Sequence, residues 1–344
     1  MGDDMHKIQP DGDFTVDEKK DGKTTMIKLA FVWDWEVPAI QCLTWKDGLA
    51  KAIQILSKEW EVKCYSIGKD TIFYHDYFPI ILKPIPELLA QEILKEKPDA
   101  ILVFGDFTRP TIPLLANRGI PMACCLAGGT FRNYVDCFDL IFVESEVYKN
   151  QLEAEGKRVI KAFGTNTELF KPIKQPKIWD AINSSTFALW KRHELFAKAM
   201  EGYKTFCFGW MYHNHETECW KIPQEKGVMI APHIPMEVIP YLLNASYTSL
   251  ITSDSTGGSQ RSVLEAISCG IPPIVMTDSD KTTEYIRESG FGKTVNPTIV
   301  EIREAVDFFK KNPPNPEVGH KFIIENYSEY IYAKKLQNGI LSIL

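Results

Sequence analysis

Residues Thr252 to Pro272 read Thr-Ser-Asp-Ser-Thr-Gly-Gly-Ser-Gln-Arg-Ser-Val-Leu-Glu-Ala-Ile-Ser-Cys-Gly-Ile-Pro, the most informative stretch of the chain. Short apolar runs flank it, Tyr247 to Ile251 before and Pro273 to Met276 after, and both are typical of buried strands. Between them, apolar residues at helical spacing predict one short helix that stops at Gly270. The predicted unit is therefore strand, glycine loop, helix, strand.

The paired glycines Gly257 and Gly258 lie just before this helix. Glycine lets the backbone come close to a ligand, and a helix N-terminus presents free N–H groups and the positive end of the helix dipole. A phosphate is the natural occupant of such a place. The alternative is that two glycines merely form a tight turn, and both interpretations stay open at this point.

Length and composition narrow the class of protein. The chain has 344 residues, which predicts two domains. Its hydrophobic fraction of 44% and charged fraction of 24% are ordinary for a globular protein. The net charge of −6, with no long basic run, argues against non-specific attachment to nucleic acid as the main activity.

The cysteine pattern and the chain start bear on the compartment. The eight cysteines are scattered without a Cys-x-x-Cys pair, so they predict neither a zinc site nor a disulfide framework and favour a reducing cytoplasm. No apolar segment reaches 18 residues, and residues 1–25 are polar and acidic, which predicts a flexible tail rather than a signal peptide.

Strand and helix patterns alternate along the whole chain. In the first half, strands are expected at 28–33, 61–67, within 71–83, and at 99–104, 121–126, 140–144 and 158–162, with helices at 45–58, 86–95, 111–117 and 145–155. In the second half, strands are expected at 204–209, 227–231, 247–251 and 273–276, and 211–220 is expected to be a loop. Helices are expected from near 191, at 236–244, after the glycine loop, and at 282–288, 299–311 and 316–337.

This alternation predicts an α/β fold of two doubly wound, Rossmann-like domains that face each other across a cleft. After the tail (1–25), the predicted domains are 26–165 and 166–320, joined by a proline-punctuated crossover at 164–176. Residues 321–344 are predicted to form a C-terminal helix that can cross back to the first domain. Ligands are expected at the carboxyl ends of the strands.

Three stretches carry a resemblance to a known family: Gly164-Thr-Asn-Thr-Glu-Leu-Phe-Lys-Pro172, Val263-Leu-Glu-Ala-Ile-Ser-Cys-Gly-Ile-Pro-Pro-Ile-Val275, and Thr283-Glu-Tyr-Ile286 followed by Gly290-Phe-Gly292. They resemble the crossover, the Leu-Glu-Ala-Met-Ala-Cys-Gly segment and the following glycine pattern of the retaining, GT-B-fold glycosyltransferases of family 4. The resemblance implies transfer of a sugar, with retention, from a UDP- or GDP-sugar to an acceptor hydroxyl. It implies no required cofactor and no metal.

Glu265 aligns with the second glutamate of that family's Glu-x7-Glu pair, which the resemblance implies hydrogen-bonds the donor ribose hydroxyls. The alternative is a capping box with Ser262, which has the required spacing, although Ser259 is a competing N-cap. The first glutamate of the pair is replaced by Gly257. Asp254 and Gln260 are the nearby side chains that can replace its hydrogen bonds.

Cations for the donor diphosphate are expected near the start of the second domain. Lys191 stands where the family has the lysine of an Arg-x4-Lys-Gly segment, and the adjacent Arg192 can neutralise the second phosphate charge. The alternative is an ordinary solvated helix start. Arg261 is a further candidate cation beside the glycine loop. His233 and Ile234 fall in a loop that the resemblance implies contacts the nucleobase.

In the first domain, Asp106, with Arg109 nearby, is the candidate carboxylate for orienting the acceptor. The alternative is that Asp106 caps the helix that begins near Pro110. His213 and His215, with Cys219, superficially resemble a metal cluster but lack convergent spacing, so no metal site is predicted.

Three functions follow as hypotheses. The first is a metal-independent, retaining glycosyltransferase in which Lys191, Glu265 and Asp106 act on the substrates. The second is a GT-B module that binds a nucleotide or a partner without catalysis, motivated by Gly257. The third is a nucleotide-sugar epimerase of the same fold. The acceptor is left open among a saccharide, a lipid, a protein and a modified nucleic-acid base.

Overall fold

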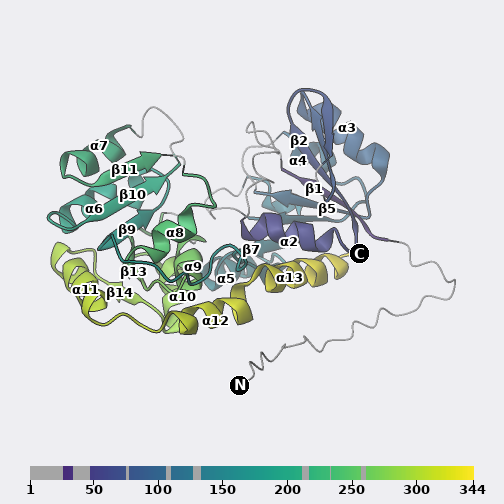
Figure 1. Ribbon diagram of the computed structural model, residues 1–344. Helices are drawn as coiled ribbons and strands as arrows, with labels where there is room; N and C mark the ends of the chain where they lie inside the picture. Colours follow the sequence, from purple (N-terminus) through teal and green to yellow (C-terminus); the bar gives the residue numbers. More distant parts are fainter. Residues whose placement is uncertain are drawn as a thin grey trace, which may run out of the picture.

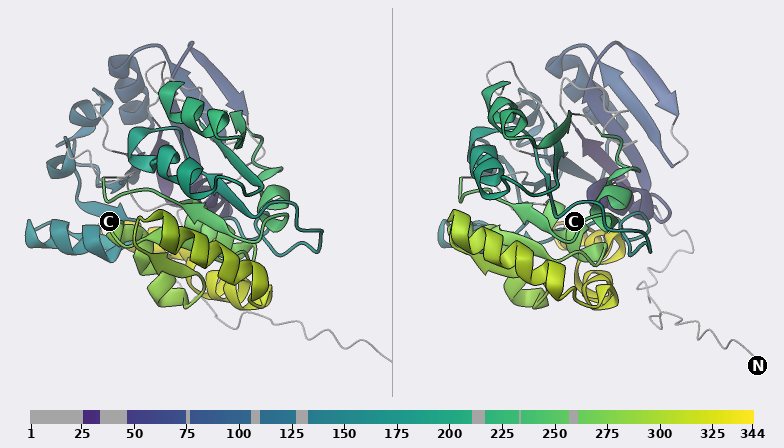
Figure 2. Two further views of the ribbon diagram at one scale, coloured as in Figure 1. Left: turned by 90° about the vertical axis from the view of Figure 1, so that its left-hand side faces the viewer. Right: turned by 60° about the vertical axis from the view of Figure 1, so that its left-hand side comes forward.

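The computed structural model describes residues 26–33, 47–74, 77–105, 110–126, 133–210, 217–232, 234–256 and 261–344, and the statements below refer to these ranges. Within them the chain forms two sheets with helices packed on both faces (Figure 1). The views of Figure 2 show the same layers from two other sides. The predicted α/β class with two doubly wound halves is confirmed.

The first sheet contains eight strands in the described ranges: β1 (Lys28–Val32), β2 (Glu61–Ile67), β3 (Thr71–Tyr74), β4 (Pro79–Lys83), β5 (Ala100–Phe104), β6 (Met122–Cys125), β7 (Leu140–Val143) and β8 (Val159–Lys161). Their order is β3-β4-β2-β1-β5-β6-β7-β8, and the edge strand β3 is antiparallel to its neighbour β4. The other pairs are parallel.

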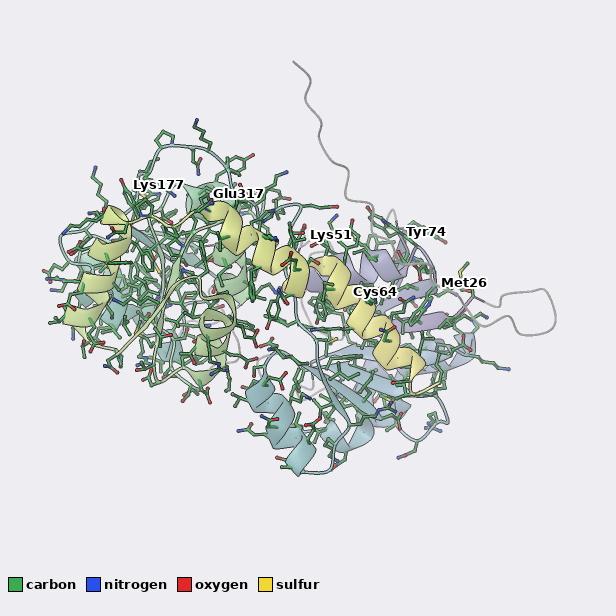
Figure 3. All side chains as sticks on the ribbon, turned by 90° about the horizontal axis from the view of Figure 1, so that it is seen from below. Met26, Lys51, Cys64, Tyr74, Lys177 and Glu317 are labelled. Carbon is green, nitrogen blue, oxygen red and sulfur yellow. The ribbon has the colours of Figure 1, made fainter. Side chains whose placement is uncertain are left out.

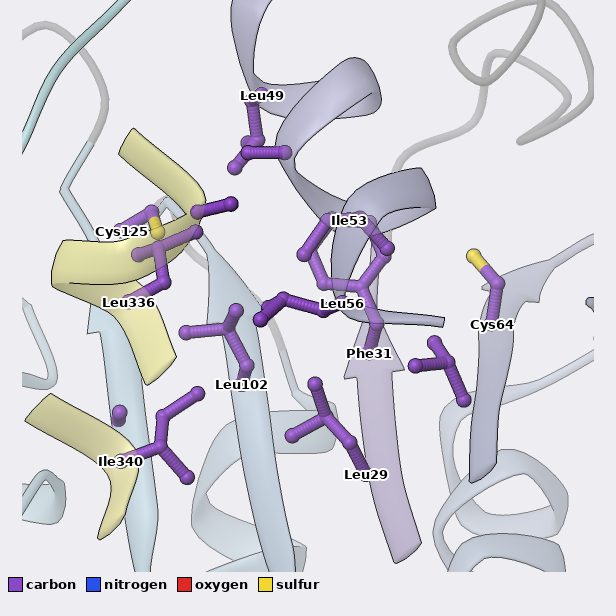
Figure 4. Close-up of a cluster of buried hydrophobic side chains, with 14 of the residues drawn as sticks. Leu29, Phe31, Leu49, Ile53, Leu56, Cys64, Leu102, Cys125, Leu336 and Ile340 are labelled. Atoms are coloured by element: carbon purple, nitrogen blue, oxygen red, sulfur yellow. The ribbon is translucent and has the colours of Figure 1, made fainter. Parts of the chain in front are cut away.

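Alternate residues of the central strand β1 point to opposite faces of this sheet, as the pleat requires. Leu29 and Phe31 pack under α2 (Gly48–Leu56) and α13 (Glu329–Leu341), which cover one face together (Figure 4). Ala30 and Val32 pack under α3 (Pro86–Glu96), α4 (Thr111–Leu115) and α5 (Glu146–Ala154) on the other. The last helix of the chain is thus part of the first half's core.

The second sheet contains β9 (Ala181–Ser184), β10 (Thr205–Gly209), β11 (Met229–Pro232), β12 (Ser249–Ile251), β13 (Pro273–Met276) and β14 (Lys293–Val295). Their order is β11-β10-β9-β12-β13-β14, and the pairs are parallel. The helices of this half are α6 (His193–Ala199), α7 (Thr217–Glu225), α8 (Ile239–Asn244), α9 (Arg261–Ser268), α10 (Asp280–Ser289), α11 (Ile299–Lys311) and α12 (Pro316–Tyr327).

Helices α6 and α11 cover one face of the second sheet, and α8, α9, α10 and α12 contribute to the clusters on the other. The predicted end of the helix after the glycine loop is confirmed, since α9 ends at Ser268 and Gly270 adopts a positive φ of 71°. A Cβ at Gly270 would lie 2.2 Å from Pro316 Cβ, so α12 can pack closely there.

The structure corrects four expectations about single elements. Strand β9 was not predicted, because its polar residues Asn183 and Ser184 do not look like a central strand. Strand β14 was also not predicted. Helix α7 begins at Thr217, inside a stretch predicted to be a loop. The helix predicted at 316–337 is two helices, because Ser328 is extended (φ −68°, ψ 161°) and caps α13 through Ile331 N.

The chain passes between the halves at two neighbouring points. The crossover after β8 and the break at Ser328 lie side by side, since Thr165 N donates to Tyr327 O at 2.9 Å and Thr165 pairs with Ser328. Seen from below, α12 starts near Glu317 and α13 continues in line past Lys51 (Figure 3). No helix in the described ranges is long and apolar enough to cross a membrane.

Candidate functional site

The candidate site lies where the strand order of the second sheet reverses. The chain runs outward from β9 to β10 and β11, returns to place β12 on the other side of β9, and continues outward from there. In open α/β sheets, ligands bind beyond the carboxyl ends of the strands at such a reversal. The segments that leave β9 and β12 carry the predicted residues Lys191, Asp254 and Glu265.

Hydrogen bonds fasten the two segments together. Thr252 Oγ1 donates to the Lys191 carbonyl oxygen at 2.7 Å, and Asp254 N donates to the Trp190 carbonyl oxygen at 3.0 Å. Asn183, in β9, donates from Nδ2 to Thr252 Oγ1 at 3.4 Å. Asn183, a polar residue of β9, is therefore linked through Thr252 to the backbone that carries Lys191.

Lys191 ends a short 3-10 turn (Leu189–Lys191), and only 7% of its surface is exposed. Burial lowers its pKa to about 8, against the opposing attraction of Glu144 and Asp254. The alternative of an ordinary solvated helix start is therefore wrong for this lysine. A buried cation attracts an anion more strongly than a solvent-exposed cation does.

The turn that carries Lys191 is anchored by His193. Its ring stacks on Phe187 with centroids 4.8 Å apart, and its Nε2 lies 3.0 Å from the Thr186 carbonyl oxygen. Burial lowers the pKa of His193 to about 4, so the imidazole is neutral at physiological pH and serves as a fixed structural contact.

Arg192 follows in a left-handed conformation, with φ 48° and ψ 48°. Its two terminal nitrogens form a bidentate pair with Asp278, at 2.8 Å each. Its Nε is buried and has no hydrogen-bond partner among the described residues. Asp278 thus holds the arginine at the edge of the candidate site.

Glu265 lies in α9, and 6% of its surface is exposed. Burial raises its pKa to about 7, while Arg261 lowers it and Asp47 raises it further. Ser262 is the second residue of α9 rather than its N-cap, so the capping-box alternative is wrong. The carboxylate accepts no hydrogen bond from the residues that the structure describes.

Arg261 joins the two halves beside Glu265. Its Nη1 donates to Asp47 Oδ2 at 2.5 Å, and its guanidinium lies 5.7 Å from the Phe163 ring centroid. Burial disfavours its charge, but Asp47 and Glu265 outweigh this and raise the pKa of Arg261. Asp47 also caps α2 by accepting from Ala50 N at 2.8 Å. The starts of α2 and α9 are thus held together.

Two residues of the candidate site were not predicted from the sequence, Asp47 and Lys281. Asp47 carries no motif, and its partner is 214 positions away in the chain. Lys281, in α10, donates to the Ser255 carbonyl oxygen at 3.0 Å and lies 4.2 Å from the Tyr148 ring centroid. It is a second buried cation near the segment that leaves β12.

The remaining predicted residues divide into two groups. Asp254 accepts from Thr256 N at 2.8 Å, and Ile234 packs partly buried against the cluster around Phe170. Asp106, Arg109, His213, His215, His233, Gly257, Gly258, Ser259 and Gln260 lie outside the described residues. Within the described ranges, no three His, Cys, Asp or Glu side chains are placed to hold a metal ion.

The chain has the GT-B fold. It consists of two doubly wound halves, its polar site lies at the strand-order reversal of the second half, and its last helix packs on the first half. A glycosyltransferase from Rickettsia africae matches with a TM-score of 0.72 at 13% identity, over 92% of this chain and 98% of that chain. Sucrose-phosphate synthase from Thermosynechococcus elongatus matches at 0.69 and 14% identity, over 92% and 98%. HepE from Anabaena, in complex with UDP, matches at 0.69 and 12% identity, over 92% and 100%.

At these identities the structural similarity establishes the fold. No protein-family model matches the sequence, and the comparison with curated proteins gives no match.

Proposed function

We propose that this protein is a glycosyltransferase that moves a sugar from a nucleoside-diphosphate sugar to an acceptor hydroxyl. The observation that carries the proposal is the burial of one cation, Lys191, and one carboxylate, Glu265, in the segments that follow adjacent strands. Glu144 acts electrostatically on both Lys191 and Arg261, which supports the convergence of these segments on one site. A donor needs both kinds of group: a cation for its diphosphate and an acceptor of hydrogen bonds for its ribose.

Lys191 is proposed to bind the diphosphate. Its pKa of about 8 leaves most molecules protonated at pH 7, and a bound phosphate would stabilise the charge that burial disfavours. The buried Ser253 hydroxyl and Arg192 Nε, both without a partner among the described residues, offer further donors at the same edge of the sheet.

Glu265 is proposed to accept hydrogen bonds from the two ribose hydroxyls, as the family 4 resemblance implies. The ionised form makes the stronger acceptor, and Arg261 favours that form at the start of the same helix. Binding of the donor should therefore displace the proton that burial leaves on Glu265 near neutral pH.

The proposed transfer follows from these positions. The bond between the donor sugar's anomeric carbon and the diphosphate breaks, and a bond from the acceptor oxygen forms on the same face. The departing phosphate oxygen takes the acceptor's proton, and Lys191 stabilises the charge that develops there. Retention, independence from metal and membership of family 4 are parts of the proposal that rest on the resemblance in sequence.

The choice of donor draws on the structural neighbours. HepE was solved with UDP and glucose, and an E. coli trehalose-6-phosphate protein was solved with UDP-2-fluoro glucose. These complexes support UDP-sugars as the first donors to test.

A second candidate is a nucleotide-binding module without transfer activity. Gly257, where the family has its first glutamate, favours it, because that acid lies beside the donor sugar in the family. Turnover of a panel of UDP- and GDP-sugars in the presence of EDTA separates the two functions. Nucleotide binding with no transfer or hydrolysis of any donor would favour the module.

The site itself is tested by calorimetric titration with UDP and GDP. Lys191→Met should weaken binding of the preferred nucleotide at least tenfold, on the order of 1.4 kcal/mol. Lys198→Met is the matched control, since Lys198 is a half-exposed lysine on the adjoining helix α6. Equal nucleotide affinity in the two variants would contradict the assignment of Lys191.

A further inference from the structure

A cavity of about 430 Å³ lies on the seam between the two halves. Helix α5 and strand β8 of the first sheet line it together with α10, α12 and α13. Its charged lining residues are Glu146, Lys149, Lys161, Glu288 and Lys335. The candidate nucleotide residues do not line it, so it is a separate feature of the fold.

The carboxylates around this cavity are already engaged. Lys161 Nζ donates to Glu284 and, at 2.7 Å, to Glu288, and the Tyr327 hydroxyl also donates to Glu288. Glu284 additionally accepts from Glu146 N at 3.0 Å. These bonds engage Lys161 with both carboxylates.

Lys335 forms no ion pair with the described residues. No carboxylate oxygen among them lies within 4.0 Å of its Nζ, which lies 6.0 Å from the centroid of the Tyr327 ring. Burial lowers the pKa of Lys335 and the positive charge of Lys161 lowers it further, while Glu288 and Glu146 act in the opposite direction. A lysine held beside another lysine in a cavity is stabilised by an anion placed between them.

Lys149 supplies a second cation on the opposite wall. Its partner Glu146 is 3.6 Å away, and both side chains are about one-third or more exposed. Such a surface pair contributes little and exchanges readily for a stronger anion. Lys149 belongs to α5 and Lys335 to α13, so an anion between them would contact both walls.

We propose that this cavity binds a small phosphomonoester, whose dianionic phosphate lies between Lys149 and Lys335. Lysine is a compact point charge that suits phosphate, and the volume is in the range of small-molecule sites. Both lysines belong to helices packed on the first sheet, and residues of α10 and α12 from the second half complete the lining. This inference does not depend on the proposed glycosyl transfer.

The test is calorimetric titration of the full-length protein with glucose 6-phosphate and, separately, inorganic phosphate. We expect saturable binding of glucose 6-phosphate with a dissociation constant on the order of 1 mM or below. Glucose, the neutral counterpart, should not bind. Saturable binding of glucose 6-phosphate, with or without binding of inorganic phosphate, supports the proposal.

Two variants and two controls locate the site. Lys335→Met should weaken binding at least tenfold, and it removes a repulsion, so its folding can be verified by an unchanged or raised melting temperature. Lys149→Met should weaken binding as well. Lys321→Met, an exposed lysine of α12, and Lys191→Met, in the candidate nucleotide site, should leave it intact. Absence of saturable binding, or loss in Lys191→Met with full retention in Lys335→Met, would overturn the proposal.

Discussion

Substituting Glu265 by glutamine should stabilise the empty protein while weakening its binding of nucleotide. Burial raises the pKa of Glu265 from its ordinary value of 4.5 to about 7. The folded protein therefore holds this proton more tightly than the unfolded chain does. The stability that the protonated form contributes is complete below pH 4.5 and is lost as the pH rises through 7. The difference corresponds to about 3 kcal/mol at pH 8.

Glu265→Gln keeps the shape of the side chain and cannot ionise, so it escapes this loss. Its unfolding free energy relative to the wild type should rise by about 1 kcal/mol or less between pH 4 and pH 5, and by about 3 kcal/mol up to pH 8. Urea denaturation at several pH values measures the difference. Calorimetry at pH 8 should show the opposite effect on UDP affinity, with a loss of at least about tenfold.

Glu153→Gln is the matched control, because it makes the same chemical change at an exposed position of α5. A stability difference for Glu265→Gln that stays flat from pH 4 to pH 8 would refute the burial argument. An unchanged UDP affinity would refute the role of Glu265 in the site. The pH dependence of stability and the UDP affinity are measured independently of each other.

Four further substitutions test the residues around Glu265 and the contact between the halves. Lys191→Met should stabilise the empty protein at pH 7 by about 1–3 kcal/mol, as measured by urea denaturation. Burial lowers the pKa of Lys191 from 10.5 to about 8, so the folded protein binds this proton less tightly than the unfolded chain does. The wild type therefore loses stability as the pH falls from 10.5 to 8, and the methionine variant does not. Arg261→Leu should cost about 3–5 kcal/mol, because it leaves the Asp47 carboxylate buried without its cation. Adding Asp47→Asn should recover part of that loss, and a double-mutant cycle that shows additivity would contradict the pairing. Gly48→Ala should cost on the order of 3 kcal/mol in thermal unfolding, since its Cβ would lie 2.1 Å from Gly164 O, and a wild-type melting temperature would contradict the close approach.

The sequence predicted most of the fold because most strands are fully apolar. Runs such as Ala100–Phe104 and Pro273–Met276 are buried on both faces and cannot be mistaken for surface segments. Strand β9 was missed because Asn183 satisfies its amide through Thr252, a contact 69 positions away. The break at Ser328 was missed because one extended serine is invisible within a helical pattern of apolar residues.

The candidate site was predictable in part. Motif spacing singled out Glu265 and Lys191, but Asp47 and Glu144, which act on their pKa values, come from the other half of the molecule. The Asp47 carboxylate reaches Arg261 only after folding, and Lys281 reaches the Ser255 carbonyl oxygen from a helix with no recognisable motif. Side chains that meet only through tertiary packing do not follow the spacing of a helix or strand, so no sequence pattern predicts their contact.

The paired chain crossings at Thr165 and Ser328 limit how the halves can move. A single tether would permit swivelling in every direction, whereas two adjacent tethers bonded to each other must bend together. Any rotation of one half against the other therefore bends both segments at once, near Thr165 and Ser328. Such a rotation would break the Arg261 contact with Asp47 while α13 stays packed on the first sheet.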